Sequence, residues 1–272
     1  MTMNEMTRPL KTIAASLALA FAGLAGAQTL SIGGAQLQMK PESLQEELAF
    51  GKVVASQLLG AAKLVPNPQL QRYVNLVGRR VAEQAGRKEI NWAFGVVDST
   101  AVNAFATPGG YILVTSALFQ MLETEDELAG VLGHEVAHVV HKHHYRVMRK
   151  QQMLEFGANA VAIGGEAGAM ADKLSGMAAN VLARGLDRAA EHEADRDGMV
   201  YAARAGYDAS ALIRVMEKLA AVSKDESSKL HTATHPTAAD RSVTMARAVN
   251  PDIEKAAVPS PAASRLQRQF KN

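Results

Sequence analysis

The chain has 272 residues, 48% of them hydrophobic, which is enough to bury one large core or two small ones. Its formal net charge is only +2 and its aromatic content is 5%, which argues against a basic or base-stacking surface for nucleic acid. It has no cysteine, so packing rather than disulfide bonds must stabilise the fold.

The first 27 residues have the pattern of an export signal. Arg8 and Lys11 precede an apolar stretch at 13–25, which ends in a small-residue cleavage pattern. The stretch is shorter than the roughly 20 residues that span a bilayer, which favours a cleaved signal over a retained anchor. We therefore expect a signal peptide at 1–27 and a periplasmic protein.

Three parts are expected after the signal: an irregular leader at 28–41, a domain at 42–250 and a disordered tail at 251–272. The domain is predicted to be α+β and mainly helical. Apolar residues three and four apart predict its helices, at 42–62, 70–85, 116–122, 124–150, 186–205, 208–222 and 237–249. Alternating segments predict a small antiparallel sheet, with strands at 90–97, 103–107 and 111–115.

One segment of the domain has an unusual composition. Residues 157–179 are rich in Ala, Gly and Met. They fit a buried pair of closely packed helices, which we favour, or a mobile lid.

His134, Glu135 and His138 form an H-E-x-x-H motif inside the helix predicted over 124–150. Residues four apart on a helix share a face, with Cβ atoms about 5–6 Å apart, so both imidazoles can bind one zinc ion. The glutamate between them can reach a metal-bound water. The motif therefore predicts a zinc hydrolase, and among zinc hydrolases it favours a metalloprotease.

A catalytic zinc ion usually has three protein ligands and one open position, so a third ligand must lie elsewhere in the chain. His144 has the spacing of a third histidine, but a continuing helix would carry it about 9 Å beyond His138. We therefore expect His141, His143 and His144 to be surface groups on an extended basic helix.

Glu191 is the other candidate for the third ligand. Glu191 and Asp195 lie four apart on a predicted helix and share a face. Glu191 would bind the metal, and Asp195 would accept a hydrogen bond from the outer N–H of a ligand histidine. The competing interpretation is a solvated face with ion pairs to Arg188 and Arg196, which the upstream motif outweighs.

Four motifs in this order resemble those of the HtpX and CAAX-prenyl-protease type of zinc metallopeptidase. Besides H-E-x-x-H, they are N-A-F-A-T-P-G-G at 103–110, E-H-E-A-D at 191–195, and His235-Pro236 followed by Arg241. The resemblance covers roughly residues 40–250, and it implies a zincin-like fold of the gluzincin type. The chain lacks the long apolar spans of the membrane-embedded members and the repeat extension of some periplasmic ones.

The resemblance implies that His235 lies near the metal. His235 could donate to the developing oxyanion, bind as a regulatory fourth ligand that keeps the enzyme latent, or be a loop residue without a role. Arg241 could orient a carboxylate such as Glu191, or be a surface charge. These alternatives remain open from the sequence.

The segment before the zinc helix predicts how a substrate binds. Its five residues could form an edge strand beside the cleft: Asn103, Ala104, Phe105, Ala106 and Thr107. An extended peptide would pair with this strand through backbone hydrogen bonds, which tolerate many side chains. Such tolerance suits a protease that removes misfolded proteins, although an ordinary hairpin has the same sequence pattern.

The sequence thus predicts an exported zinc metalloendopeptidase with one Zn²⁺ per chain and Glu135 as general base. Its expected substrates are misfolded or unassembled envelope proteins, and association with the outer membrane or with envelope assembly proteins is possible. The alternatives are a chaperone-like or latent protein with the protease fold and little activity, and a zinc hydrolase of small molecules. The intact Glu135 argues against a pure metal-binding role.

Overall fold

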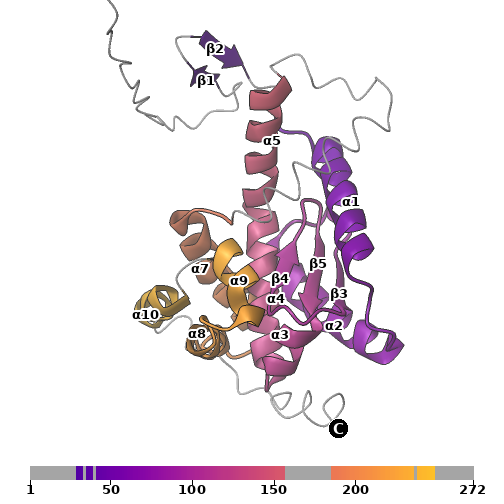
Figure 1. The fold of residues 1–272 in the computed structure, drawn as a ribbon, viewed down its shortest axis with the longest axis vertical. Helices are drawn as coiled ribbons and strands as arrows, with labels where there is room; N and C mark the ends of the chain where they lie inside the picture. Colours follow the sequence, from indigo (N-terminus) through magenta and orange to yellow (C-terminus); the bar gives the residue numbers. More distant parts are fainter. Residues whose placement is uncertain (1–28, 33–34, 39–40, 157–184, 236–237, 249–272) are drawn as a thin grey trace, which may run out of the picture. The chain divides into compact units, whose positions relative to one another are not determined.

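The computed structural model describes residues 29–32, 35–38, 41–156, 185–235 and 238–248 (Figure 1). The chain divides into two compact units, Met1–Pro41 and Glu42–Asn272. In the first unit, β1 (Thr29–Ile32) and β2 (Ala35–Gln38) form an antiparallel hairpin, where the sequence predicted an irregular leader.

Three of the sequence predictions lie outside the described residues. They are the signal peptide at 1–27, the helix pair or lid at 157–179, and the tail at 251–272. Among the described helices, none is both long enough and apolar enough to cross a membrane.

The second unit is mainly helical, with one small sheet, as predicted. Its helices are α1 (Leu44–Ala61), α2 (Pro68–Ala82), η1 (Glu83–Ala85), α3 (Ser116–Met121), α4 (Glu125–Val140), α5 (His143–Phe156), α7 (Arg188–Arg204), α8 (Ala211–Ala221), η2 (Glu226–Ser228), α9 (Lys229–Thr234) and α10 (Ala238–Ala248). The short helix α9 was not predicted.

The sheet is mixed rather than antiparallel, which corrects the prediction. Its strands are β3 (Ala93–Val97), β4 (Ala104–Ala106) and β5 (Tyr111–Thr115), in the order β3-β5-β4. β4 and β5 form the expected antiparallel hairpin, whereas β3 and β5 are parallel. The chain reverses twice between β3 and β5, so these two strands run the same way, and β4 is left at an edge.

One face of the sheet belongs to the main core. Ala104, Ala106, Ile112 and Val114 alternate onto this face, and all four are buried. They join the hydrophobic cluster that also contains apolar residues of α2 and α4. The side chains of β4 that alternate onto this face therefore lie against the core that contains α4, the helix with the H-E-x-x-H motif.

Helices α4 and α7 cross at a pair of glycines. A Cβ atom added to Gly133 would lie 2.6 Å from the carbonyl oxygen of Gly198, and one added to Gly198 would lie 2.6 Å from the backbone nitrogen of His134. Only two helices without side chains at the crossing can approach so closely. This contact brings the helix with Glu191 and Asp195 against the helix with the H-E-x-x-H motif.

The long helix predicted over 124–150 is broken. α4 ends at Val140 and α5 begins at His143, because Lys142 has a left-handed backbone with φ of 56°. The Nζ of Lys142 lies 2.9 Å from a carboxylate oxygen of Glu42, and the hydroxyl of Tyr145 donates to Glu46 at 2.8 Å. These contacts with residues at the start of α1 hold the turn, and no local sequence pattern reveals them.

Candidate metal centre

The two histidines of the motif converge inside the protein. His134 and His138 are both buried on α4, and their Nε2 atoms are 2.9 Å apart. Thr124 begins the helix, since its hydroxyl oxygen accepts a hydrogen bond from the backbone N–H of Glu127 at 3.1 Å. Burial lowers the pKa of His138 well below its ordinary value, so this imidazole stays neutral, which is the form that binds metals.

Glu191 on α7 meets both rings. Its Oε2 lies 3.7 Å from Nε2 of His134, and its Oε1 lies 3.6 Å from Nε2 of His138. Burial opposes ionisation of Glu191, but the nearby His235 and Arg241 outweigh it and lower its pKa to about 2. The carboxylate is therefore charged and directed at the two imidazoles.

His235 is the fourth member of this group. It follows α9, and its Nδ1 lies 3.0 Å from Oε2 of Glu191, while its Nε2 lies 3.9 Å from Oε1 of Glu135. Burial lowers the pKa of His235, but the two carboxylates outweigh burial and raise it. Among the described residues, His134, His138, Glu191 and His235 each offer a ligand atom, and these atoms all lie within 4.8 Å of one another.

Asp195 and Arg241 surround the ligands. Oδ1 of Asp195 lies 3.0 Å from Nδ1 of His134, on the side of the ring away from the other imidazole. Arg241 is 1% exposed and contacts both Asp195 and Glu191. Burial would raise the pKa of Asp195, but the guanidinium outweighs it and holds that pKa well below its ordinary value.

Glu135 is buried beside the group, and one of its oxygens, Oε2, has no hydrogen-bond partner among the described residues. Burial raises the pKa of this carboxyl group. A cavity of about 20 Å³ touches Glu135, with Ala104, His134 and His235 among its walls, and a space of this size can hold one water molecule. Two imidazoles, a carboxylate, a third imidazole and room for water suit a divalent cation such as zinc.

Of the three histidines that follow the motif, His144 is buried and the His143 side chain is only 10% exposed, contrary to the prediction of surface groups, whereas the His141 side chain is 25% exposed. His144 is buried, which lowers its pKa to about 3, and its ring centre lies 5.4 Å from that of His138. His143 contacts His138, and His141 contacts Asp197 at 2.7 Å. The break at Lys142 folds His143 and His144 back against the site, whereas His141 lies before the break. His144 is nonetheless outside the group of four, in agreement with the prediction.

Of the residues predicted to bind substrate, Asn103 and Thr107 are buried in contacts within the fold, whereas Phe105 lines a pocket. The side chain of Asn103 is fully buried and contacts Thr234 at 3.3 Å and His231 at 3.4 Å. Thr107 is also buried, and its backbone N–H donates to Tyr111 at 2.9 Å. Asn103 thus ties the sheet to α9. The spacing H-x-x-x-H at 231 and 235 was the available sequence signal for this helix.

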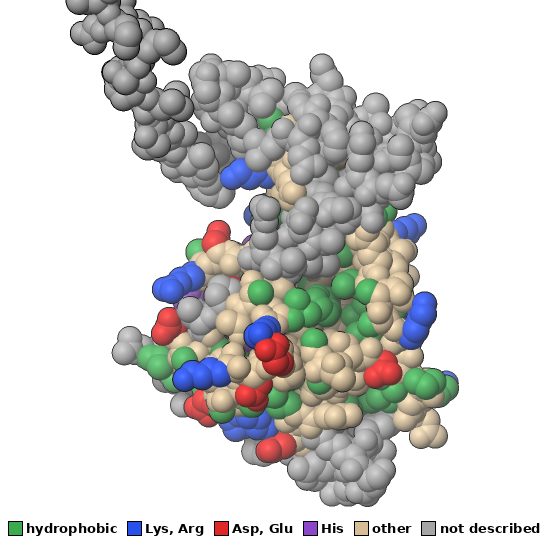
Figure 2. Space-filling model, in the orientation of Figure 1, with side chains coloured by type: hydrophobic (Ala, Val, Ile, Leu, Met, Phe, Trp, Pro, Cys, Tyr) green, Lys and Arg blue, Asp and Glu red, His purple; other side chains and the backbone are tan. Residues whose placement is uncertain are grey.

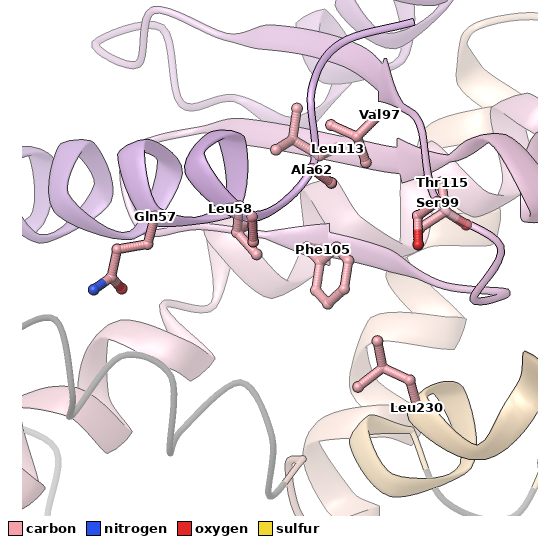
Figure 3. A pocket seen from close by; sticks show the side chains of 10 residues that line it. Gln57, Leu58, Ala62, Val97, Ser99, Phe105, Leu113, Thr115 and Leu230 are labelled. Atoms are coloured by element: carbon pink, nitrogen blue, oxygen red, sulfur yellow. The ribbon is translucent and has the colours of Figure 1, made fainter.

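An apolar pocket lies on the outer face of the sheet (Figure 3). Phe105 and Leu113 are paired across β4 and β5, and both line it. Leu58 of α1 and Leu230 of α9 stand on either side, and the volume is about 460 Å³. Figure 2 shows hydrophobic side chains gathered over the sheet in the centre of this face.

These features define a class of protein. A helix with H-E-x-x-H, completed by a carboxylate from a second helix, is the site of a metallopeptidase of the zincin type. The chain belongs to peptidase family M48, whose sequence model matches residues 68–248. The resemblance seen in the sequence is thereby confirmed.

The chain is also similar in sequence to named proteases. The chain is 33% identical over 226 residues to the beta-barrel assembly-enhancing protease of Yersinia pestis, covering 77% of this chain and 46% of that protein. It is 34% identical over 205 residues to the protein of the same name in Escherichia coli K12, covering 72% and 40%. It is 34% identical over 159 residues to the mitochondrial metalloendopeptidase OMA1 of Arabidopsis thaliana, covering 58% and 32%. The chain spans less than half the length of these relatives.

Proposed function

We propose that the chain is a zinc endopeptidase in which His134, His138 and Glu191 hold the ion. The convergence of these three side chains in a buried site carries the proposal. Zinc bound there would lower the pKa of a water ligand toward neutrality and polarise the carbonyl of the scissile bond.

Glu135 is proposed as the general base. Its unpartnered oxygen and the adjacent water-sized cavity support this role, because a general base must lie within reach of the attacking water. The carboxylate would take the proton of that water and later pass it to the leaving amine. Asp195 and Arg241 would hold His134 and Glu191 in place, without touching the substrate.

His235 is proposed as a regulatory residue. Four protein donors around one ion leave no position for water, and this is the pattern of structural rather than catalytic zinc sites. The position of His235 beside Glu191 supports a resting enzyme that becomes active when His235 moves away. A role as oxyanion donor is the alternative, and the two roles predict opposite effects of its removal.

An extended polypeptide is the proposed substrate, and β4 would bind it. The backbone groups of Asn103, Phe105 and Thr107 face β5, so those of Ala104 and Ala106 face the opposite edge. Among the described residues no strand pairs with that edge. Ala104 also lines the cavity at Glu135, so a peptide added to this edge would pass the proposed base.

The apolar pocket supports a preference within that substrate. Side chains alternate along an added strand, so every second one would lie on the same face as Phe105. We propose that a large apolar side chain of the substrate enters the space between Phe105 and Leu230. A peptide library scanned one position at a time should show one position where Leu or Phe is preferred over Asp, and Phe105→Ala should weaken that preference.

The cellular setting is proposed from two observations. The first 27 residues have the pattern of an export signal, and relatives carry the name beta-barrel assembly-enhancing protease. We propose a periplasmic enzyme that removes misfolded or unassembled envelope proteins, in association with outer-membrane assembly proteins. The names of these relatives support this setting, and a binding experiment would identify the partners.

The test of the proposed function uses Glu135→Gln. The variant should keep one zinc ion per chain, measured by metal analysis, and lose hydrolysis of an unfolded casein-like substrate by about 10²–10⁴-fold. Unchanged hydrolysis by the variant would contradict the assignment of Glu135. Absence of bound zinc in the unaltered protein would contradict the site.

A further inference from the structure

His143 lies against the outer side of the ring of His138. It is the first residue of α5, and its Nδ1 is 2.9 Å from Nδ1 of His138. The other nitrogen of His138, Nε2, faces His134 and Glu191. The two ring nitrogens of His138 therefore have different partners.

The positions of the hydrogens follow from this arrangement. A ring nitrogen that binds a cation carries no hydrogen, so His138 must carry its hydrogen on Nδ1. That N–H can donate to His143 only if Nδ1 of His143 is an acceptor, which places the hydrogen of His143 on Nε2. Nε2 of His143 lies 3.1 Å from Oε2 of Glu193, which can accept it.

We propose that His143 and Glu193 form a hydrogen-bonded relay that fixes the tautomer and orientation of the metal ligand His138. Both are positioning residues. The inference rests on the proposed metal site and extends it. Each histidine of the motif then has a carboxylate behind it: Asp195 contacts His134 directly at 3.0 Å, and Glu193 reaches His138 through His143.

The break between α4 and α5 brings His143 into contact with His138. In an unbroken helix His143 would lie about 7.5 Å along the axis from His138 and on a different face. The left-handed turn at Lys142 brings it back over the ring. Glu193 comes from α7, between Glu191 and Asp195, so three acidic residues of one helix serve the same site.

Zinc affinity is the direct test, because it does not depend on activity. The metal-free chain would be titrated with Zn²⁺ in competition with a chromophoric chelator. Partners of metal-binding histidines typically change affinity about 10–100-fold, so His143→Ala should weaken binding by that factor. His143→Asn should keep most of the affinity, because its amide oxygen can accept the hydrogen bond from His138. Glu193→Ala should have a smaller effect, since that side chain is 41% exposed.

His141→Ala is the matched control. His141 stacks on His143 and contacts Asp197, and its Nδ1 lies 3.7 Å from Oε2 of Glu193, but it contacts no proposed ligand. The hydrogen bond between His138 and His143 stays in this variant, so zinc affinity should change far less than in His143→Ala. With Co²⁺ in the site, His143→Ala should shift the visible absorption bands and His141→Ala should not.

Equal zinc affinity and equal Co²⁺ spectra for His143→Ala and the unaltered chain would overturn the relay. A loss of stability alone would then mean that His143 only fastens the start of α5. If the unaltered chain binds no zinc, the proposed function fails first, and the relay falls with it.

Discussion

Arg241 donates to both oxygens of Asp195, from Nε to Oδ2 at 2.8 Å and from Nη2 to Oδ1 at 2.6 Å. Its remaining nitrogen, Nη1, lies 2.8 Å from Oε2 of Glu191. One buried guanidinium thus contacts two buried carboxylates at once, which its planar fork of donors allows. The same carboxylates face His134, so this ion pair helps to assemble the metal site.

Removal of this guanidinium is expected to destabilise the protein strongly. Arg241→Gln leaves Asp195 buried without its cation and Glu191 with His235 alone, and breaking a buried ion pair in this way costs about 3–5 kcal/mol. Urea unfolding in the presence of a chelator measures the effect without metal. Arg72→Gln, at an exposed position of α2, should change stability by less than about 0.5 kcal/mol. Similar midpoints for the two variants would contradict this account.

The close contact of α4 and α7 at Gly133 and Gly198 predicts a second loss of stability. Gly198→Ala places a methyl group against the backbone of α4, so α7 must move away. We expect a loss of about 1–3 kcal/mol, as for other overpacked sites. Zinc affinity should fall too, because α7 carries Glu191.

Gly60→Ala serves as the control for that substitution. Gly60 lies in α1, and no atom lies within 4 Å of the place that an added Cβ would take, so alanine should stabilise the helix by about 0.5–1 kcal/mol. If both variants change stability in the same direction, the crossing is not as close as described.

The break between α4 and α5 can be tested with two substitutions at one residue. Lys142→Gly and Lys142→Ala both remove the contact with Glu42. At a left-handed residue alanine is strained by about 1–2 kcal/mol, so the glycine variant should be the more stable one. In an unbroken helix the order would be reversed, with glycine less stable by about 1 kcal/mol. Thermal unfolding of the two variants decides between these orders.

His235→Ala should raise the rate of peptide hydrolysis. If His235 blocks the open position of the metal, its removal admits water while three ligands remain. If His235 instead donates to the oxyanion, the rate should fall by about 10²–10³-fold. Assays at matched zinc content separate the two roles, and a fall would refute the regulatory one.

Glu42 should make stability depend on acid pH. Its oxygens lie 2.9 Å from Lys142 and 2.9 Å from Arg146. Partial burial raises the pKa of Glu42, but the two cations outweigh it and lower the pKa below its ordinary value of 4.5. The folded state therefore binds this proton less tightly than the unfolded state, so ionised Glu42 stabilises the fold above that value.

Glu42→Gln should consequently be less stable than the unaltered protein at pH 7. The difference should shrink as the pH falls below 4.5 and through the lower pKa of the folded state. Urea midpoints measured from neutral to acid pH follow it. A difference that stays constant with pH would mean that the two ion pairs contribute nothing.

Much of the local structure could be predicted from the sequence. The zinc-motif helix begins where Thr124 caps it, and β5 has the predicted bounds at 111 and 115. Glu191 was expected to approach the two histidines from a distant helix, and the structure brings it within 3.7 Å of His134. These predictions rest on capping, alternation and spacing, which act over a few residues.

Other features depended on contacts between distant segments. The parallel pairing of β3 with β5 follows from the path of the connecting chain, and the left-handed Lys142 is held by Glu42, a hundred residues earlier. Because that turn was not foreseen, His143 and His144 were expected on the surface, and they are instead folded against His138.

By itself, then, the sequence determined which residues the proposed chemistry uses: the two imidazoles and the acid of one helix turn, and the acids of another. Helical periodicity is a local property, so it can be read along the chain. Only the tertiary structure decided how those side chains are supported, with Arg241 between two carboxylates and His143 behind His138. Such support depends on contacts between segments far apart in sequence, of Arg241 with Asp195 and of Lys142 with Glu42 at the turn that brings His143 back, and such contacts have no local pattern.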